Sequence, residues 1–137
     1  MDKQLVLEKL EALRRCIKRI ETKRPRTFKE LKNNLDLQDI LSVNLERAVQ
    51  LCVDIGAHII AQTESKPPDT MAKTFDLLAE KQIITNSTAL AMKKAVGFRN
   101  IAVHNYQSVN WEIVFNICHH KLEDFKTFAK EINDELA

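Results

Sequence analysis

Residues 99–106 bring together side chains that could do chemistry on a phosphodiester. Arg99 supplies a planar cationic fork that fits a phosphate. His104 supplies an imidazole, which gives and takes protons near neutral pH. This pair is sufficient for RNA cleavage without a metal: the ribose 2′-hydroxyl attacks the adjoining phosphate, and Arg99 stabilises the charge that develops. The same two residues could instead be a surface cation and a polar helix end.

The spacing of these residues limits how they could share one ligand. On a helix, Asn100 and His104 lie four residues apart and share a face, and Arg99 and Tyr106 would align if the helix continued. Arg99 and His104 point about 140° apart. Both can reach one phosphate through the length of the arginine, at a helix end, or in a site shared between two chains.

Helical periodicity and the scarcity of breakers indicate which elements position this stretch. The chain has 137 residues, of which 45% are hydrophobic, two are Gly and three are Pro. We therefore expect one domain over residues 1–137, all-α, folded as an up-and-down bundle of about five helices. Residues 27–34 could form a short helix or an ordered loop. The expected helices cover approximately residues 3–23, 37–62, 70–81, 85–104 and 111–137.

The expected helix over residues 37–62 has an unusually wide apolar face. Its polar residues form a narrow strip that contains Asp39, Glu46, Gln50 and Asp54. Such a helix packs against several neighbours, either in the centre of the bundle or against a second subunit. Asp54 is a candidate partner for Arg99 or for a charge on another chain. His58, at the edge of the apolar face, is expected to be packed or at an interface.

Charge is concentrated in one segment. The formal net charge is only +2, so a nucleic-acid site must come from local clustering. Residues 14–32 hold nine Lys and Arg against Glu21 and Glu30. This segment could be a track for an RNA backbone or for an acidic partner. A solvated helix face is the simpler interpretation.

The remaining reactive side chains point to structural roles. Cys16, Cys52 and Cys118 are odd in number and far apart, which favours buried thiols in a reducing compartment over disulfides or zinc. Adjacent His119 and His120 would point about 100° apart on a helix, so we expect no metal site there and no cofactor. Trp111 is expected in the core. The N-terminus lacks a signal-peptide pattern and no apolar run reaches membrane-spanning length, so we expect a cytoplasmic protein without membrane contact.

The order of residues around Arg99 resembles the HEPN superfamily and, within it, the HepT-like toxins. The family signature is Arg, a polar residue, three further residues, His, one residue and Tyr, which this chain matches at Arg99, Asn100, His104 and Tyr106. At Asn105 the family often has an acidic residue. Further similarity covers most of residues 36–111 and includes residues 44–48, 54–56, 67–68, 75–78 and 96–98.

The resemblance implies a toxin of a toxin–antitoxin system that is dimeric. In such toxins the motifs of two chains face each other and form one composite, metal-independent endoribonuclease site. Arg99 and His104 would then be catalytic, Asn100 supporting, and Tyr106 would line the site. It also implies a nucleotidyltransferase antitoxin that silences the toxin by adenylylation of Tyr106, which places bulk and negative charge where substrate phosphate would bind.

Two other functions remain open at this point. The chain could be a non-catalytic substrate-binding or accessory subunit of a minimal nucleotidyltransferase, with the motif as a pocket for nucleotide phosphates. It could also be a plain interaction bundle in which Arg99 and His104 are structural. RNA cleavage by the chain alone, together with the intact mass of the chain, separates these possibilities.

Overall fold

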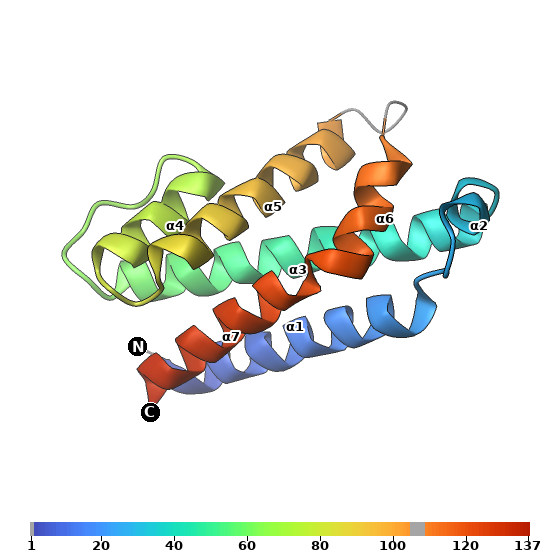
Figure 1. The fold of residues 1–137 in the computed structure, drawn as a ribbon. Coiled ribbons are helices and arrows are strands. Elements are labelled where there is room, and N and C mark those ends of the chain that lie inside the picture. Colours follow the sequence, from blue (N-terminus) through green and yellow to red (C-terminus); the bar gives the residue numbers. More distant parts are fainter. Residues whose placement is uncertain (1, 105–108) are drawn as a thin grey trace.

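The part of the chain that the structure describes is built from helices, which confirms the all-α prediction (Figure 1). The structure, a computed structural model, describes residues 2–104 and 109–137, and of residues 101–104 only the helical backbone. Within these ranges the helices are α1 (Lys3–Lys23), α2 (Phe28–Lys32), α3 (Leu35–Ala61), α4 (Met71–Glu80), α5 (Asn86–His104), α6 (Trp111–His120) and α7 (Leu122–Leu136).

Local capping residues determine where most of these helices begin. The side chain of Asp2 accepts a hydrogen bond from the backbone N–H of Leu5, and Thr70 accepts one from that of Lys73. Asn34 and Asn110 do the same at the starts of α3 and α6. Each of these side chains satisfies a backbone donor that has no partner inside its own helix.

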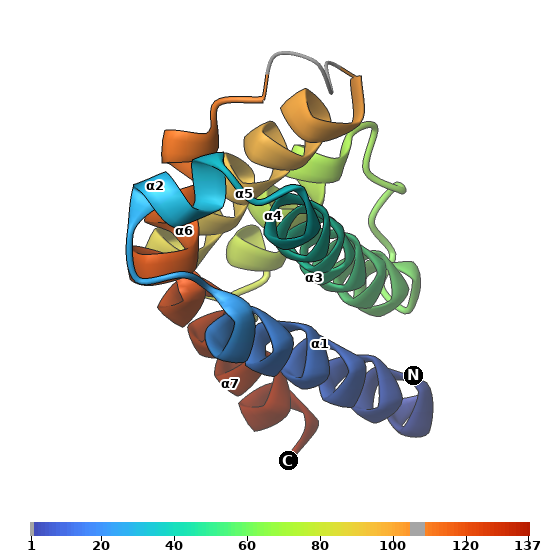
Figure 2. The ribbon, with the colours of Figure 1, turned by 90° about the vertical axis from the view of Figure 1, so that its right-hand side faces the viewer.

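Helix α3 is the centre of the bundle, as its wide apolar face predicts. It packs against α1 along much of its length and also contacts α2, α4, α5, α6 and α7. In both views α1 and α7 lie on one side of α3 and α5 lies on the other (Figures 1 and 2). Gly56 allows the approach of α4, since a Cβ at this position would lie 2.6 Å from Thr74 Cγ2.

The described residues form more helices than the approximately five predicted, because the segment left open as helix or loop is a helix and the last predicted helix is divided. Residues 28–32 form α2, and the expected C-terminal helix is divided at Lys121 into α6 and α7. The apolar stripe continues through this division, but its two halves meet different neighbours. Helix α6 packs against α2 and α3, whereas α7 packs chiefly against α1 and α5. One straight helix could not cover both surfaces.

The three cysteines are free and buried, as predicted. Burial raises the pKa of the Cys118 thiol to about 12, and it also raises the pKa of Cys52. Neither thiol is therefore a nucleophile at neutral pH in the folded chain. None of the helices that the structure describes is long and apolar enough to span a membrane.

Candidate functional site

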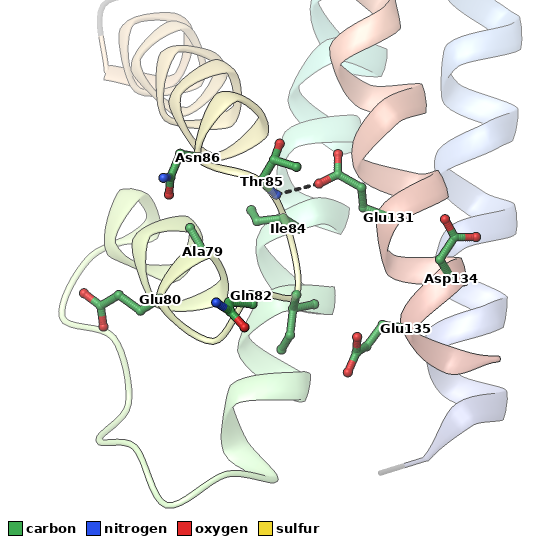
Figure 3. A pocket seen from close by; sticks show the side chains of 10 residues that line it. Ala79, Glu80, Gln82, Ile84, Thr85, Asn86, Glu131, Asp134 and Glu135 are labelled. Atoms are coloured by element: carbon green, nitrogen blue, oxygen red, sulfur yellow. Dashed lines mark hydrogen bonds between the residues drawn. The ribbon is translucent and has the colours of Figure 1, made fainter.

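The N-terminal end of α5 is held by hydrogen bonds to α7. Figure 3 shows Glu131 reaching from α7 to the backbone N–H of Thr85, at an N···O distance of 2.6 Å. The second carboxylate oxygen of Glu131 accepts a hydrogen bond from the Thr88 hydroxyl at 2.5 Å. Thr85 in turn accepts a hydrogen bond from the Thr88 backbone N–H at 3.1 Å and so caps the start of α5. Every donor in this cluster has an acceptor, so the start of α5 is fixed.

The middle of α5 is packed between α3, α4 and α7. Met92, Val96 and Phe98 are buried in the core. On the neighbouring face Lys93 forms an ion pair of 3.0 Å with Asp76 of α4. These contacts set both the rotation and the position of the helix, and therefore the direction in which the following residues leave it.

Arg99 lies just beyond this packed segment, and among the described residues its charge has no anionic partner. Its Nη1 contacts the sulfur of Met71 at 3.6 Å, which is a weak hydrogen bond. Its Nε atom is buried and has no hydrogen-bond partner among the described residues. Among the described residues, no carboxylate lies within 4.0 Å of its guanidinium. An unsatisfied buried donor costs free energy, and such groups are found where a ligand completes the site.

The other motif residues follow Arg99 at the end of α5. Asn100 is exposed, and the described part of α5 extends to His104. The side chain of His104 and all of Tyr106 lie outside the described residues. The helical backbone nevertheless keeps the angle of about 140° between positions 99 and 104. Three arrangements that bring both side chains to one phosphate therefore remain compatible with the backbone: a long reach by the arginine, a helix end, or a site shared between two chains.

An apolar groove lies beside this end of α5. It has a volume of about 720 Å³ and runs between α5 and α6, with walls from α3 and α7. Leu90 and Ile113 line it, with 53% and 47% of their surfaces exposed. Gly97 lies in the same groove, and a Cβ there would have no atom within 4 Å. The groove therefore exposes apolar surface within one turn of Arg99.

Asp54 does not pair with Arg99 in this chain. Its carboxylate accepts a hydrogen bond of 2.8 Å from Gln50 and lies 4.0 Å from the ammonium of Lys9 in α1. The predicted pairing of Asp54 with Arg99 is therefore wrong within one protomer. The physical reason is that the polar strip of α3 faces α1, whereas α5 packs on another side of α3. His58, on the same helix, is half-buried, and its Nε2 has no hydrogen-bond partner among the described residues.

His119 has a structural role. Its Nε2 lies 2.7 Å from the carbonyl oxygen of Pro25, and its ring centroid lies 4.4 Å from that of Phe115. Arg24 adds a hydrogen bond of 2.8 Å to the carbonyl oxygen of Cys118. These contacts attach the turn after α1 to α6. No group of three metal-ligating side chains occurs within the described ranges. Trp111 is half-buried at the edge of the core.

Sequence reasoning missed two features near Arg99. Met71 fits the helical spacing of α4, but nothing in the sequence indicates that its sulfur meets Arg99. The exposed groove residues Leu90 and Ile113 also look like ordinary helix positions. A signal for the groove does exist in the sequence, because Gly97 stands inside a helical segment where Gly is unfavourable.

Comparison with known proteins decides the family. The family model described as "Ribonuclease HepT-like" matches residues 11–132. The chain belongs to this family. It is 38% identical to the mRNA nuclease HepT of Shewanella oneidensis over 131 residues, which cover 96% of this chain and 98% of that protein. It is 30% identical to the tRNA nuclease HepT of Aphanizomenon flos-aquae over 112 residues, or 75% and 76% of the two chains.

Solved structures agree with the family assignment. The tri-AMPylated HEPN toxin of Shewanella oneidensis, in complex with its MNT antitoxin, superposes with a TM-score of 0.88. This toxin is 38% identical to the present chain, and the match covers 94% of this chain and 96% of the toxin. The predicted resemblance to HepT-like HEPN toxins is thereby confirmed.

Proposed function

We propose that this protein is the toxin of a toxin–antitoxin system and a metal-independent endoribonuclease. Arg99 binds and stabilises the scissile phosphate, His104 transfers protons, and Asn100 supports the substrate. The observation that carries this proposal is the half-buried Arg99, whose guanidinium has no carboxylate within 4.0 Å in the described part of the chain. The family relationship to HepT nucleases supports the choice of RNA.

The proposed reaction needs one proton acceptor and one proton donor. The ribose 2′-oxygen attacks phosphorus while one imidazole takes its proton. The bond from phosphorus to the 5′-oxygen breaks, and that oxygen receives a proton from a second imidazole. The products are a 2′,3′-cyclic phosphate and a 5′-hydroxyl. Arg99 stabilises the extra negative charge on the phosphoryl oxygens during the transfer.

We propose that the second imidazole is His104 of another copy of the chain. This solves the angular separation between Arg99 and His104, because neither chain completes the site alone. The apolar groove with Leu90, Gly97 and Ile113 supports it, since it offers apolar surface for a second copy beside the motif. Gly97→Trp should fill this groove, giving monomers by sedimentation and loss of cleavage. Dimers with full cleavage would contradict this arrangement.

The proposed partner is a nucleotidyltransferase antitoxin, and the proposed point of control is Tyr106. Adenylyl groups on Tyr106 would bring phosphates to the place where Arg99 would otherwise bind the phosphate of RNA. The related HEPN toxin of Shewanella oneidensis is tri-AMPylated and in complex with an MNT antitoxin, which supports the kind of partner and adenylylation as the kind of modification. The proposal includes a cytoplasmic toxin with one domain over residues 1–137.

RNA cleavage in the presence of EDTA tests the proposed function. The purified chain, shown by intact mass to be unmodified, should cleave RNA, and His104→Ala should lower the rate by about 100-fold or more. His120→Ala is the matched control, because His120 is an exposed histidine of α6 outside the site. Equal cleavage by His104→Ala and the parent would remove His104 from the mechanism.

The same experiment addresses the alternative of an accessory subunit. A chain that is unmodified by mass, and that binds the nucleotidyltransferase but cleaves no RNA, would contradict the nuclease. It would support a docking role for Arg99. A chain that carries the mass of added adenylate should gain cleavage activity when that mass is removed.

A further inference from the structure

A second groove, between α1 and α3, holds three arginines that the proposed reaction does not use. Arg15 and Arg19 belong to α1 and Arg47 belongs to α3; all three are exposed and line a groove of about 850 Å³. Arg15 and Arg19 are one helical turn apart on the same face. Burial raises the pKa of the Cys16 thiol, and the charges of Arg47 and Arg15 oppose this shift, so both arginines lie near Cys16. The two helices therefore direct guanidinium groups at one groove.

The positive charge continues beyond this groove along α1 and α2. Lys23 is one turn after Arg19, and the exposed Arg26, Lys29 and Lys32 follow at the turn and on α2. Glu21 forms an ion pair of 2.8 Å with Lys126 of α7. Within the described ranges, Arg14 is the one cation of residues 14–32 that has a carboxylate within 4.0 Å.

The cations of the groove, together with Lys23, Arg26, Lys29 and Lys32 beyond it, are called the basic row below. The basic row extends toward the end of the bundle that carries the motif. Helix α1 runs toward the end of the bundle where α2 lies, and α5 runs toward the same end (Figures 1 and 2). A polymer that lay along the basic row would therefore extend toward the end of the molecule that carries the Arg99 motif. A small anion would not need such a length of charge.

The chemistry of the groove favours RNA over an acidic protein. Arginine forks pair with phosphate oxygens in bidentate fashion. Between the arginines lie apolar side chains, including the exposed Val43, and two carboxylates, Asp39 and Asp54. Asp54 is already held by Gln50 and Lys9, so the arginines set the charge that the groove offers to a ligand. An elongated row of cations beside exposed apolar side chains fits a single RNA strand whose phosphates contact the arginines.

We propose that the groove between α1 and α3 binds the phosphodiester backbone of the RNA substrate, with Arg15, Arg19 and Arg47 as the phosphate contacts. The inference rests on the proposed function only in its choice of RNA, since none of these arginines takes part in the reaction. This surface holds the strand, whereas Arg99 acts on the phosphate that is cut. Binding is independent of base sequence, because backbone contacts carry no sequence information.

Salt-dependent RNA binding tests this inference. The full chain carrying His104→Ala binds a labelled single-stranded RNA of mixed sequence without cutting it, and the dissociation constant is measured at several salt concentrations. Each phosphate contact to a single strand contributes about 0.7 to the slope of log affinity against log salt. Changing all three arginines to Gln should therefore lower the slope by about 2 and weaken binding by about tenfold or more at physiological salt.

Two control variants separate phosphate contact from general charge and from folding. Changing the three arginines to Lys keeps their charges, so the slope should stay within about one contact of the parent value. Changing Lys3, Lys81 and Lys130 to Gln removes the same charge from exposed positions elsewhere, and the slope should not change. Melting temperatures of all variants show whether the fold is intact.

The outcomes distinguish this inference from the proposed function. Unchanged RNA affinity and salt slope in the Arg-to-Gln variant would overturn the proposal that the groove binds RNA, even if the parent cleaves RNA. Loss of binding to the nucleotidyltransferase with unchanged RNA binding would also overturn it and assign the groove to a protein partner. If the parent cuts no RNA but the Arg-to-Gln variant loses RNA affinity, the nuclease proposal fails and the groove stands.

Discussion

The two ends of α5 differ in whether their polar groups have hydrogen-bond partners. At the N-terminal end, both carboxylate oxygens of Glu131 accept hydrogen bonds, from the Thr85 backbone and from the Thr88 hydroxyl. At the C-terminal end, the buried Nε of Arg99 has no partner among the described residues, and its Nη1 contacts the sulfur of Met71. The polar groups of the first end are paired within the fold, whereas the second end holds the cation that we propose binds a phosphate.

The comparison separates residues that build the helix from residues that the helix presents. Hydrogen bonds at a helix start contribute to the free energy of unfolding, typically about 0.5–1.5 kcal/mol for each bond. An unpaired arginine contributes little to stability, yet it can bind a phosphate strongly. Substitutions at the two ends should therefore affect different measurements.

The largest expected effect is on cleavage by Arg99→Ala. We expect the rate to fall by about 100-fold or more, because the developing charge loses its only assigned cation. The melting temperature should change little, since Arg99 has no ion pair with any described residue. Lys73→Ala, at an exposed cation of α4, is the control and should keep the parent rate. If Arg99→Ala unfolds the protein while Lys73→Ala does not, Arg99 is structural.

The second effect is on stability at the other end of α5. Glu131→Ala should lower the free energy of unfolding by about 1–3 kcal/mol, because the Thr85 and Thr88 donors lose their acceptor. Glu131→Gln keeps one good acceptor and should lose less. Urea titration measures both values. The rate of cleavage at low temperature should stay near that of the parent. A large loss of rate in a folded Glu131→Ala would contradict a purely structural role for this end of α5.

Two glycines give a smaller effect of opposite sign. Gly56→Ala should destabilise the fold by about 1–3 kcal/mol, because the new Cβ would lie 2.6 Å from Thr74 Cγ2. Gly97→Ala has free space around it and should stabilise α5 by up to about 1 kcal/mol through helix propensity. Denaturant titration at low protein concentration checks both. A strong destabilisation by Gly97→Ala would show that α5 is as tightly packed there as α3 is at Gly56.

The smallest effect at neutral pH is expected from Cys118, which becomes visible only in alkali. Its folded pKa of about 12 lies above the usual value of 9.0, so its contribution is complete below pH 9 and is lost as pH rises from 9 toward 12. Between pH 8 and pH 10 the parent should therefore lose more stability than Cys118→Ala does. Parallel urea titrations at the two pH values measure this difference. Equal losses would mean that the thiol is not desolvated in the fold.

Much of the helical scaffold could be predicted because its signals are local. Asp2 and Thr85 are cap formers directly before apolar periodicity, and both cap helices in the structure. The division at Lys121 could not be predicted in this way. The spacing of Cys118, Leu122 and Phe125 continues one helical stripe, and only the positions of α1 and α2 require the chain to turn there.

The candidate site could be predicted as a set of residue types but not as a set of contacts. The order of Arg99, Asn100 and His104 indicates phosphate chemistry without knowledge of the fold. That Met71 lies against Arg99, and that Asp54 lies instead against Lys9, depends on how α4 and α1 pack around α3. Such long-range packing leaves no mark at the residues themselves.

The pH dependence of RNA cleavage in EDTA is the most direct test of the account. If one imidazole takes a proton while another gives one, the rate of the unmodified chain should be bell-shaped with a maximum near neutral pH. Both limbs should be measured between pH 5 and 9 under conditions in which the fold is intact. A flat profile across this range, or activity that EDTA abolishes, would contradict a reaction carried by Arg99 and His104.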